Sequence, residues 1–329
     1  MNALVTGAGG FIGGAVTRAL QRRGAHIRVF LRPGSEPNVP DPGGLEIVRG
    51  DLRDAEAVRA AARGCDAIFH VGALYSFAAR PSEVLAANVG GTRNVLGAAR
   101  SEGVARVVYT SSIATIGGMR DGRPANESDA PLGPPPGPYK KSKWEAEALV
   151  REEAQRGLDA VIVNPTFPVG EGDVKPTPTG QLILDFLEGR MPAYVDTGMN
   201  VVDVDDVAEG HLLAFDRGAR GERYLLGNAN LTMRELLGEL AAIAGRSAPR
   251  IRLPHGVALA LAHADAFVEG MLLGRTPRVP LEGVRTSREI MFADCSRAVR
   301  ELGMPQTPVR EALVKAVGYV RSRAARRAS

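Results

Sequence analysis

Two residues four positions apart can together move a proton. Tyr139 and Lys143 begin and end the stretch YKKSK, and on a helix residues with this spacing share one face. A phenol has an ordinary pKa of about 10 and is a weak base at neutral pH, but a neighbouring ammonium lowers that pKa. The pair therefore predicts a tyrosine that exchanges a proton with an alcohol or ketone oxygen, beside a lysine that also holds the ribose of a nicotinamide cofactor.

Two hydroxyl side chains precede this pair, at the end of a strand predicted over 105–110. Ser111 and Ser112 follow that strand directly. A hydroxyl there can donate a hydrogen bond to the reacting oxygen and stabilise its charge. We assign this role to Ser112, with Ser111 as the alternative. Either serine can instead cap the end of the strand.

A glycine-rich segment near the start of the chain is suited to a dinucleotide. The segment TGAGGFIG follows a predicted strand and opens a predicted helix. Gly7 permits a tight turn, Gly10 lets the backbone approach a pyrophosphate, and Gly13 lets helix and strand pack closely. The helix N-terminus offers further N–H groups to the phosphates. We therefore expect the cofactor to be bound by Gly7, Gly10, Phe11, Ile12 and Gly13. The alternative is a glycine-rich turn with no chemical role.

The end of the second predicted strand indicates which dinucleotide is bound. An acidic residue at this place accepts hydrogen bonds from the ribose 2′-hydroxyl of NAD, but here the residue is Arg32. A guanidinium suits a 2′-phosphate, and Ser35 can add a hydroxyl, so NADP(H) is favoured over NAD(H). The alternative is a surface arginine that tolerates either cofactor. Asp51 and Leu52 follow the third strand; the carboxylate can accept the adenine amino group or cap the helix that begins near Asp54.

These residues need a scaffold that brings the ends of several strands together. Predicted strands cover 3–6, 26–31, 45–48, 66–71, 105–110 and 159–163, and predicted helices cover 11–23, 55–62, 82–102 and 139–155. Strands that alternate with helices of this length pair in parallel through right-handed crossovers. Continuously apolar strands fit a sheet that is covered on both faces. The fold class is therefore α/β, with a Rossmann-type doubly wound parallel sheet.

The second half of the chain has a different pattern. Helices are predicted over 181–188, 206–217, 232–244, 255–273 and 309–323. We expect residues 1–165, with 200–227 returning to them, to form the NADP-binding domain. A smaller substrate-binding region and a tail then comprise 166–199 and 228–329. Long loops inside a compact domain are usually functional, and 117–138 and 168–180 are such loops. Candidate substrate-binding residues are Tyr75, Ser112, Thr166 and Lys175, although the Lys175 loop can also be a proline-stiffened lid without substrate contact.

The motifs taken together resemble the extended short-chain dehydrogenase/reductase family. They are TGAGGFIG at 6–13, GDL at 50–52, FHVGA at 69–73, NVGGT at 88–92, YTSSIAT at 109–115, YKKSK at 139–143, NP at 164–165 and VDDVA at 204–208. Within the family the chain is similar to the hopanoid-associated sugar epimerases, which are themselves similar to dihydroflavonol 4-reductases. That likeness extends through DVKPTPTG at 173–180, GRMPA at 189–193 and VDTG at 195–198.

The resemblance implies roles for particular residues. It makes Ser112, Tyr139 and Lys143 a catalytic triad. Tyr139 and Lys143 also belong to the expected cofactor site, to which the resemblance adds Ala73, Asn88 and Pro165. Two positions depart from the family pattern. Asp203 stands where many extended members have histidine, which leaves its role open between structure and substrate. The segment at 70–73 reads HVGA, and we take His70 as a strand-end residue and not as a catalyst.

The resemblance also implies a reaction. The first expectation is an epimerase for a sugar-like group or lipid-linked polyol, which forms a transient ketone and consumes no cofactor. The alternative is a net NADPH-dependent ketone reductase, which Arg32 favours. A third reading, from another class, is a non-catalytic NADP-binding scaffold or sensor, which would not need Ser112, Tyr139 and Lys143 together.

Composition limits the partners. The formal net charge is +4 and the pI is about 9.3, but four arginines of the segment 321–329 supply much of it, and no nucleic-acid-binding motif is present. That tail is expected to be frayed and solvated or, together with an apolar helix over 257–273, to contact an anionic membrane surface. The two cysteines are far apart, so we predict no disulfide framework and no metal site. We expect a cytoplasmic enzyme without signal peptide, and a homodimer through the helices at 82–102 and 139–155.

Overall fold

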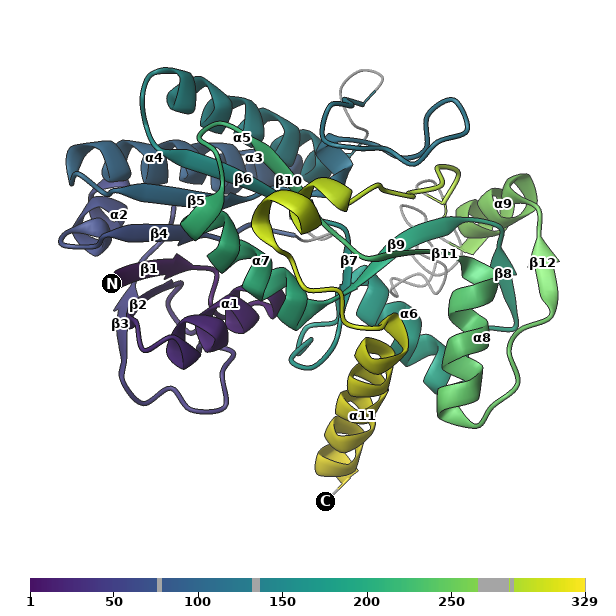
Figure 1. Cartoon of the computed structure of the whole chain (residues 1–329). Coiled ribbons are helices and arrows are strands. Elements are labelled where there is room, and N and C mark those ends of the chain that lie inside the picture. Colours follow the sequence, from purple (N-terminus) through teal and green to yellow (C-terminus); the bar gives the residue numbers. More distant parts are fainter. Residues whose placement is uncertain (76–78, 132–136, 266–283, 285–286, 329) are drawn as a thin grey trace.

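The computed structural model describes residues 1–75, 79–131, 137–265, 284 and 287–328 (Figure 1). A parallel sheet of seven strands, in the order β10-β6-β5-β4-β1-β2-β3, forms its larger part. The strands are β1 (Asn2–Thr6), β2 (His26–Leu31), β3 (Leu45–Arg49), β4 (Ala67–His70), β5 (Arg106–Thr110), β6 (Ala160–Pro165) and β10 (Arg223–Leu226). The strand order reverses between β1 and β4, and ligands of open α/β sheets bind at such a point.

Helices cover both faces of this sheet. One face packs against α1 (Phe11–Arg22) and α7 (Val204–Arg217), and the other against α2 (Ala55–Ala62), α4 (Gly91–Ser101) and α5 (Pro138–Gln155) (Figure 1). Every residue of β4 and β6 is buried, as two covered faces require. The predicted α/β, Rossmann-type doubly wound fold is confirmed.

The helix predicted over 82–102 is divided into three segments. It consists of α3 (Pro81–Leu85), a π-helical turn η1 (Ala86–Gly90) and α4. A π turn inserts an extra residue into a helix and is frequent at functional sites. Here it contains Asn88, which is buried.

The second half of the chain contains strands that the sequence pattern did not indicate. They form the sheets β11-β9-β7 and β12-β8. Their bounds are β7 (Phe167–Val169), β8 (Ala193–Val195), β9 (Gly198–Asp203), β11 (Ala229–Thr232) and β12 (Ile251–Leu253). Most have only three or four residues, too few for the two-residue period of a strand to be recognised.

The helices of this half are α6 (Pro178–Leu187), α8 (Met233–Ala244), α9 (His255–Asp265) and α11 (Val309–Ala328), and short turns are η2 (Ile113–Thr115) and η4 (Ala298–Leu302). A core cluster joins α6, α8 and α11 to β9. The expectation of a frayed tail is wrong for its described part, because α11 continues to Ala328 and Arg321 donates to the Ala244 carbonyl at 2.9 Å. Of the helix predicted over 255–273, residues 266–273 lie outside the described residues.

Candidate active site

The glycine-rich segment forms the turn between β1 and α1. Gly7 has a φ of +78°, and a Cβ there would lie 2.6 Å from Gly72. A Cβ on Gly13 would lie 2.0 Å from the Gly7 carbonyl oxygen. Both positions therefore require glycine. Helix α1 begins after Gly10, which caps it without a side chain, so N–H groups of the first turn remain for an anion. These features fit a dinucleotide pyrophosphate.

Phe11 and Ile12 contribute to this turn through the backbone. The Phe11 side chain is buried, and the Ile12 side chain packs against the same core cluster between the sheet, α1 and α7. Their side chains therefore fix the start of α1. Their backbone N–H groups lie in the first turn of α1 and are suited to bind a phosphate, whereas their side chains are not.

Asp51 lies at the end of β3, where its carboxylate is paired with Arg53 at 2.6 Å. This hydrogen bond, and more weakly the charge of Arg32, hold the pKa of Asp51 below its usual value. The alternative that Asp51 caps the following helix is wrong. Asp54 is the N-cap of α2, and its side chain accepts from the N–H groups of Glu56 and Ala57.

Three guanidinium groups surround the carboxyl ends of β2 and β3. Arg32 is exposed, and its charge acts on Asp51. Arg49 donates to the carbonyl of Ser35 at 2.5 Å and to Glu36 at 2.7 Å, which leaves the Ser35 hydroxyl out of that contact. Sequence reasoning identified Arg32 and missed Arg49 and Arg53, although all three follow or end neighbouring parallel strands. This end of the sheet is suited to an anionic group.

Lys143 is almost completely buried beneath the end of β5. Its ammonium donates to the Thr110 carbonyl at 2.5 Å and lies 4.7 Å from the centre of the Tyr109 ring. Burial lowers the pKa of Lys143 to about 7, because a charged group loses hydration there. Helix α5 places Lys143 one turn after Tyr139.

Tyr139 is in the first turn of α5 and is half-buried. The Tyr75 ring packs edge-on against it with ring centres 4.5 Å apart. Burial, followed by the Tyr75 phenol, raises the pKa of Tyr139 above its ordinary value. The hydrogen bonds among the described residues include none between Tyr139 and Lys143. Lys143 is also not among the groups that shift the Tyr139 pKa. The expectation that Lys143 lowers this pKa is therefore not met, and the phenol stays protonated at neutral pH.

The two serines have different environments. Ser111 is buried, and its hydroxyl donates to the Glu147 carboxylate at 2.5 Å. Ser112 is half-buried, and its hydroxyl oxygen accepts from the Ala114 N–H at 3.2 Å, which caps η2. Ser112 therefore caps the following turn η2, whereas the predicted alternative was a cap at the end of the strand. An oxygen that accepts can still donate its own hydrogen. The geometry favours Ser112 over Ser111 as a donor to substrate.

Asn88 connects the segment after β4 to the start of α5. Its side chain accepts from the Leu74 N–H at 2.6 Å and donates to the Leu74 carbonyl and to the Ser142 hydroxyl. Ser142 in turn donates to the Tyr139 carbonyl at 2.7 Å. Asn88 thus fixes Leu74, with Ala73 and Tyr75 on either side of it, against the turn that carries Tyr139.

The model of the NAD dependent epimerase/dehydratase family matches residues 3–227. The chain belongs to this family. It is therefore an enzyme of the NAD(P)-dependent oxidoreductase, epimerase or dehydratase type, and the matched segment contains the glycine-rich turn, both serines, Tyr139 and Lys143.

Similar proteins cover nearly the whole chain. A putative dihydroflavonol 4-reductase of Synechocystis is 44% identical, covering 97% of this chain and 96% of its own. Sterol demethylase protein B of Methylococcus capsulatus is 37% identical, covering 98% and 99%. The crystal structure of a nucleoside-diphosphate-sugar epimerase from Pseudomonas aeruginosa is 28% identical and covers 98% of both chains with a TM-score of 0.80.

In this epimerase/dehydratase chain His70 and Asp203 are both buried and hydrogen-bonded. His70 is buried between the hydroxyls of Thr6 and Thr92, at 2.7 and 3.0 Å, as expected for a strand-end residue. Asp203 is the N-cap of α7, and it is fully buried and paired with Lys315 of α11 at 2.6 Å. Asp203 therefore connects the start of α7 to α11.

The remaining predicted residues lie on two segments. Pro165 ends β6, and the buried Thr166 follows it, with its N–H donating to the Leu226 carbonyl at 3.1 Å. Lys175 is exposed on the turn in which the Asp173 carboxylate accepts from Thr177. The structure therefore does not bring Lys175 into the buried group around Lys143.

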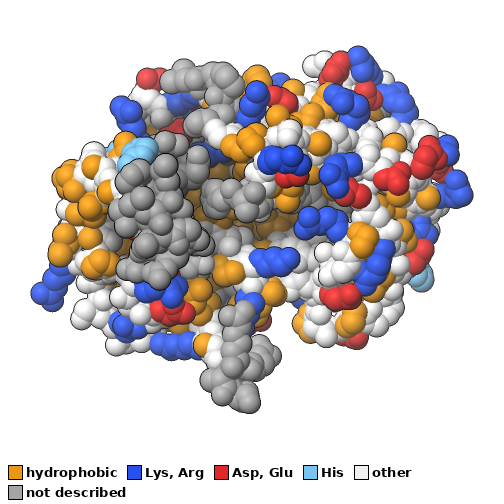
Figure 2. Space-filling view, turned by 180° about the vertical axis from the view of Figure 1, so that it is seen from behind, with side chains coloured by type: hydrophobic (Ala, Val, Ile, Leu, Met, Phe, Trp, Pro, Cys, Tyr) orange, Lys and Arg blue, Asp and Glu red, His pale blue; other side chains and the backbone are white. Residues whose placement is uncertain are grey.

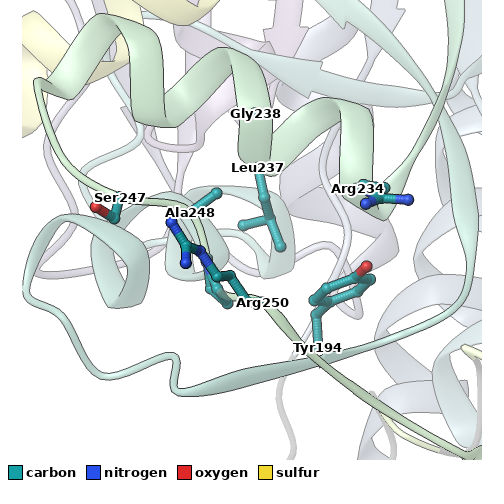
Figure 3. A pocket seen from close by; sticks show the side chains of 8 residues that line it. Tyr194, Arg234, Leu237, Gly238, Ser247, Ala248 and Arg250 are labelled. Carbon is teal, nitrogen blue, oxygen red and sulfur yellow. The ribbon is translucent and has the colours of Figure 1, made fainter.

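A cavity of about 650 Å³ lies elsewhere, between α8, β8 and the segment before β12 (Figure 3). It is lined by Tyr194, Arg234, Leu237, Gly238, Ser247, Ala248, Pro249 and Arg250. None of the predicted site residues is among them. The candidate active site instead lies at the carboxyl ends of β1, β4, β5 and β6 in the seven-stranded sheet.

Proposed function

We propose that this chain is an NADP(H)-dependent oxidoreductase that reduces a ketone on a small molecule. The observation that carries the proposal is the half-buried phenol of Tyr139, held in protonated form at the edge of a sheet that has a dinucleotide turn. A protonated phenol is prepared to donate to the oxygen of a ketone as that oxygen becomes an alcohol. The bound nicotinamide would supply the hydride.

The chain's own residues would share the remaining work. Tyr139 donates the proton, and the Ser112 hydroxyl donates a hydrogen bond that orients the same oxygen. Lys143 holds the cofactor ribose and contributes positive charge while it is protonated. Tyr75, packed on the Tyr139 ring, forms an apolar wall beside the reacting group.

The residues at the start of α1 and after β2 and β3 would bind the cofactor. The N–H groups at the start of α1 bind the pyrophosphate, and Asp51 and Leu52 border the adenine. Arg32 and Ser35 bind the 2′-phosphate, which makes NADP(H) the preferred cofactor. The exposed position of Arg32 leaves its fork accessible to a phosphate.

We also propose that different parts of the chain bind the cofactor and the substrate. Residues 1–165, with 200–227, bind the cofactor, and 166–199 with 228–329 shape the substrate site. Thr166 lies where these two parts join. Names of relatives support a ring-containing substrate with an oxygen substituent, such as a hopanoid precursor or a lipid-linked polyol: one is called a sterol demethylase protein and another a dihydroflavonol 4-reductase.

Epimerisation of a sugar-like group is the second candidate. The similarity to a nucleoside-diphosphate-sugar epimerase, with a TM-score of 0.80, favours it. An epimerase uses the same Tyr139 and Ser112 but returns the hydride to the substrate. The two reactions differ in whether NADPH is consumed.

Deuterium transfer distinguishes these candidates. The enzyme would be incubated with NADPH deuterated at C4 of the nicotinamide and with a panel of cyclic ketones and nucleotide sugars. Stoichiometric deuterium in an alcohol product, lost in Tyr139→Phe, is the expected result. Interconversion of sugars without loss of NADPH would show that the enzyme is an epimerase and overturn the reductase proposal.

Contacts with a membrane and with a second copy are part of the proposal. Hydrophobic side chains gather along the left edge of Figure 2, the end of the molecule that carries α9 and β12, and Ile251, Val257 and Leu261 there are about half exposed. No helix in the described part of the chain is long and apolar enough to cross a membrane. We propose that this end, with α9 and β12, contacts a membrane surface peripherally.

We also propose that α4 and α5 form a homodimer interface. Trp144 is exposed on α5 and would lie in this interface.

A further inference from the structure

A buried carboxylate lies one helical turn beyond Lys143. Glu147 of α5 is 4% exposed. A buried charge is costly unless donors surround it, and Glu147 has four. One oxygen accepts from Ser111 at 2.5 Å, Thr115 at 2.6 Å and Asn164 at 2.9 Å. The other is paired with the Arg223 guanidinium at 3.2 Å.

These contacts enclose the residue that we assign to the reacting oxygen. Ser111 and Thr115, both bound to Glu147, lie before and after Ser112 in the chain. The Ser112 carbonyl accepts from Asn164 at 3.1 Å and lies 2.8 Å from the Thr115 hydroxyl. The backbone of Ser112 is therefore held on both sides by groups that share one carboxylate.

Arg223 extends the same network to the loop that precedes α5. Its guanidinium donates to the carbonyls of Glu127 and Asp129. The Glu127 carboxylate in turn accepts from the Leu225 N–H on β10 at 2.8 Å. Arg223 thus connects α5 and β10 to the first part of the loop at 117–138. Because the two charges are paired, both can be buried.

The network also acts on Lys143. Burial of Lys143 disfavours its ammonium, and the negative charge of Glu147 opposes this by raising the pKa of Lys143. Among the described residues, Glu147 accepts hydrogen bonds from Ser111, Thr115, Asn164 and Arg223, and from neither the Ser112 hydroxyl nor Tyr139.

We propose that Glu147, held by Arg223, is a positioning residue of the reaction, which orients Ser112 from one helical turn beyond Lys143. The inference rests on the proposed function of Ser112 and Lys143. It requires no contact between Glu147 and substrate or cofactor. Asn164 and Thr115 act as its links to the Ser112 backbone.

The test compares Glu147→Gln with Glu153→Gln. Glu153 is on the same helix and is paired with Arg100 and Arg156 nearer the surface, so it is a matched control. The first readout is NADPH fluorescence on binding, titrated from pH 5.5 to 9 without substrate. If Lys143 holds the ribose as an ammonium, affinity falls as Lys143 deprotonates. In Glu147→Gln this fall should occur about one pH unit lower than in the wild type.

The second readout is turnover on whichever ketone the wild type reduces. Glu147→Gln should lower kcat at least tenfold and change KM less than threefold, while Glu153→Gln matches the wild type. Melting temperatures of both variants show whether the fold is retained. Unchanged pH profiles and kcat in a folded Glu147→Gln would overturn the inference. If the wild type reduces no ketone, the reductase proposal fails separately and the NADPH titration still decides the role of Glu147.

Discussion

At the scale of single residues, burial decides what each ionisable group of the site can do. It raises the pKa of Tyr139 and lowers that of Lys143 to about 7. It also lowers the pKa of His70 to about 3, so that this histidine is neutral. The YKKSK spacing predicted the pair and its shared helix face. It did not predict these directions, because they depend on residues packed around the pair from other elements.

Tyr139→Phe removes the proton donor and retains the ring. We expect kcat to fall by about 10²- to 10⁴-fold, the usual contribution of a general acid, while NADP⁺ affinity changes less than threefold. Steady-state kinetics and calorimetric titration check the two parts. A variant that keeps more than a tenth of wild-type kcat would exclude Tyr139 as the donor.

Lys143→Met removes a charge that folding buries. The folded pKa of Lys143, about 7, is below its ordinary 10.5, so between these values the unfolded chain binds more protons and wild-type stability rises with pH. At pH 6 both states are protonated and the wild type bears the full cost. We expect the variant to be inactive but about 1–3 kcal/mol more stable at pH 6, with the gain shrinking above pH 7. Chemical denaturation at pH 6 and 9 measures this, and a less stable variant at pH 6 would contradict it.

At the scale of elements, long segments were predictable and short ones were not. The strands and helices of the first half were identified because each is long or continuously apolar, as in β6 and α1. The strands β7, β8 and β12 have three residues each and carry no period. The π turn at Asn88 was also missed, since nothing in the local pattern separates it from an α-helix.

The candidate site follows the same division. The glycine turn, Tyr139 and Lys143 were visible because their chemistry depends on local spacing. Glu147 and Arg223 are 76 residues apart. The pairing of β10 with β6 and the packing of α5 on the sheet bring them together. A buried ion pair of this kind has no local signature in a single sequence.

Asp203 tests how α11 is attached to α7. It caps α7 and pairs with Lys315. Asp203→Ala should lower the free energy of unfolding by about 2–3 kcal/mol, from a lost cap and a lost partly buried ion pair. Asp216→Ala, at a more exposed carboxylate of α7 that pairs with Arg23, should cost less than 1 kcal/mol. Equal losses in urea denaturation would show that the Asp203 contacts are not what holds α11.

At the scale of the whole molecule, two buried histidines, His70 of β4 and His211 of α7, make stability depend on pH. Burial lowers the pKa of His70 to about 3 and of His211 to about 4. Below pH 6.5 the unfolded chain therefore binds protons that the folded chain does not. Stability should fall as the pH drops from 6.5 to 4, by up to about 1.4 kcal/mol per pH unit for each histidine. Denaturation across this range is the measurement, and His211→Gln should reduce the slope; equal slopes would contradict the assignment.

The apolar end of the molecule gives a second prediction at this scale. In a flotation experiment the wild type should rise with anionic liposomes, and the variant Val257→Ser/Leu261→Ser should not. The reason is that burial of apolar side chains in the membrane surface supplies peripheral binding. Truncation of residues 321–329 separates the contribution of the arginines. No flotation of the wild type would exclude a membrane contact and leave the enzyme chemistry unaffected.

The central claim is that the carboxyl edge of the sheet binds NADP(H) through Arg32. The most direct measurement is calorimetric titration of the cofactor-free protein with NADP⁺ and NAD⁺ in parallel, repeated on Arg32→Asp. We predict that NADP⁺ binds at least tenfold more tightly, about 1.4 kcal/mol, and that Arg32→Asp loses this preference. Equal or tighter binding of NAD⁺ to the wild type would contradict the account and favour an epimerase that keeps its cofactor through the cycle.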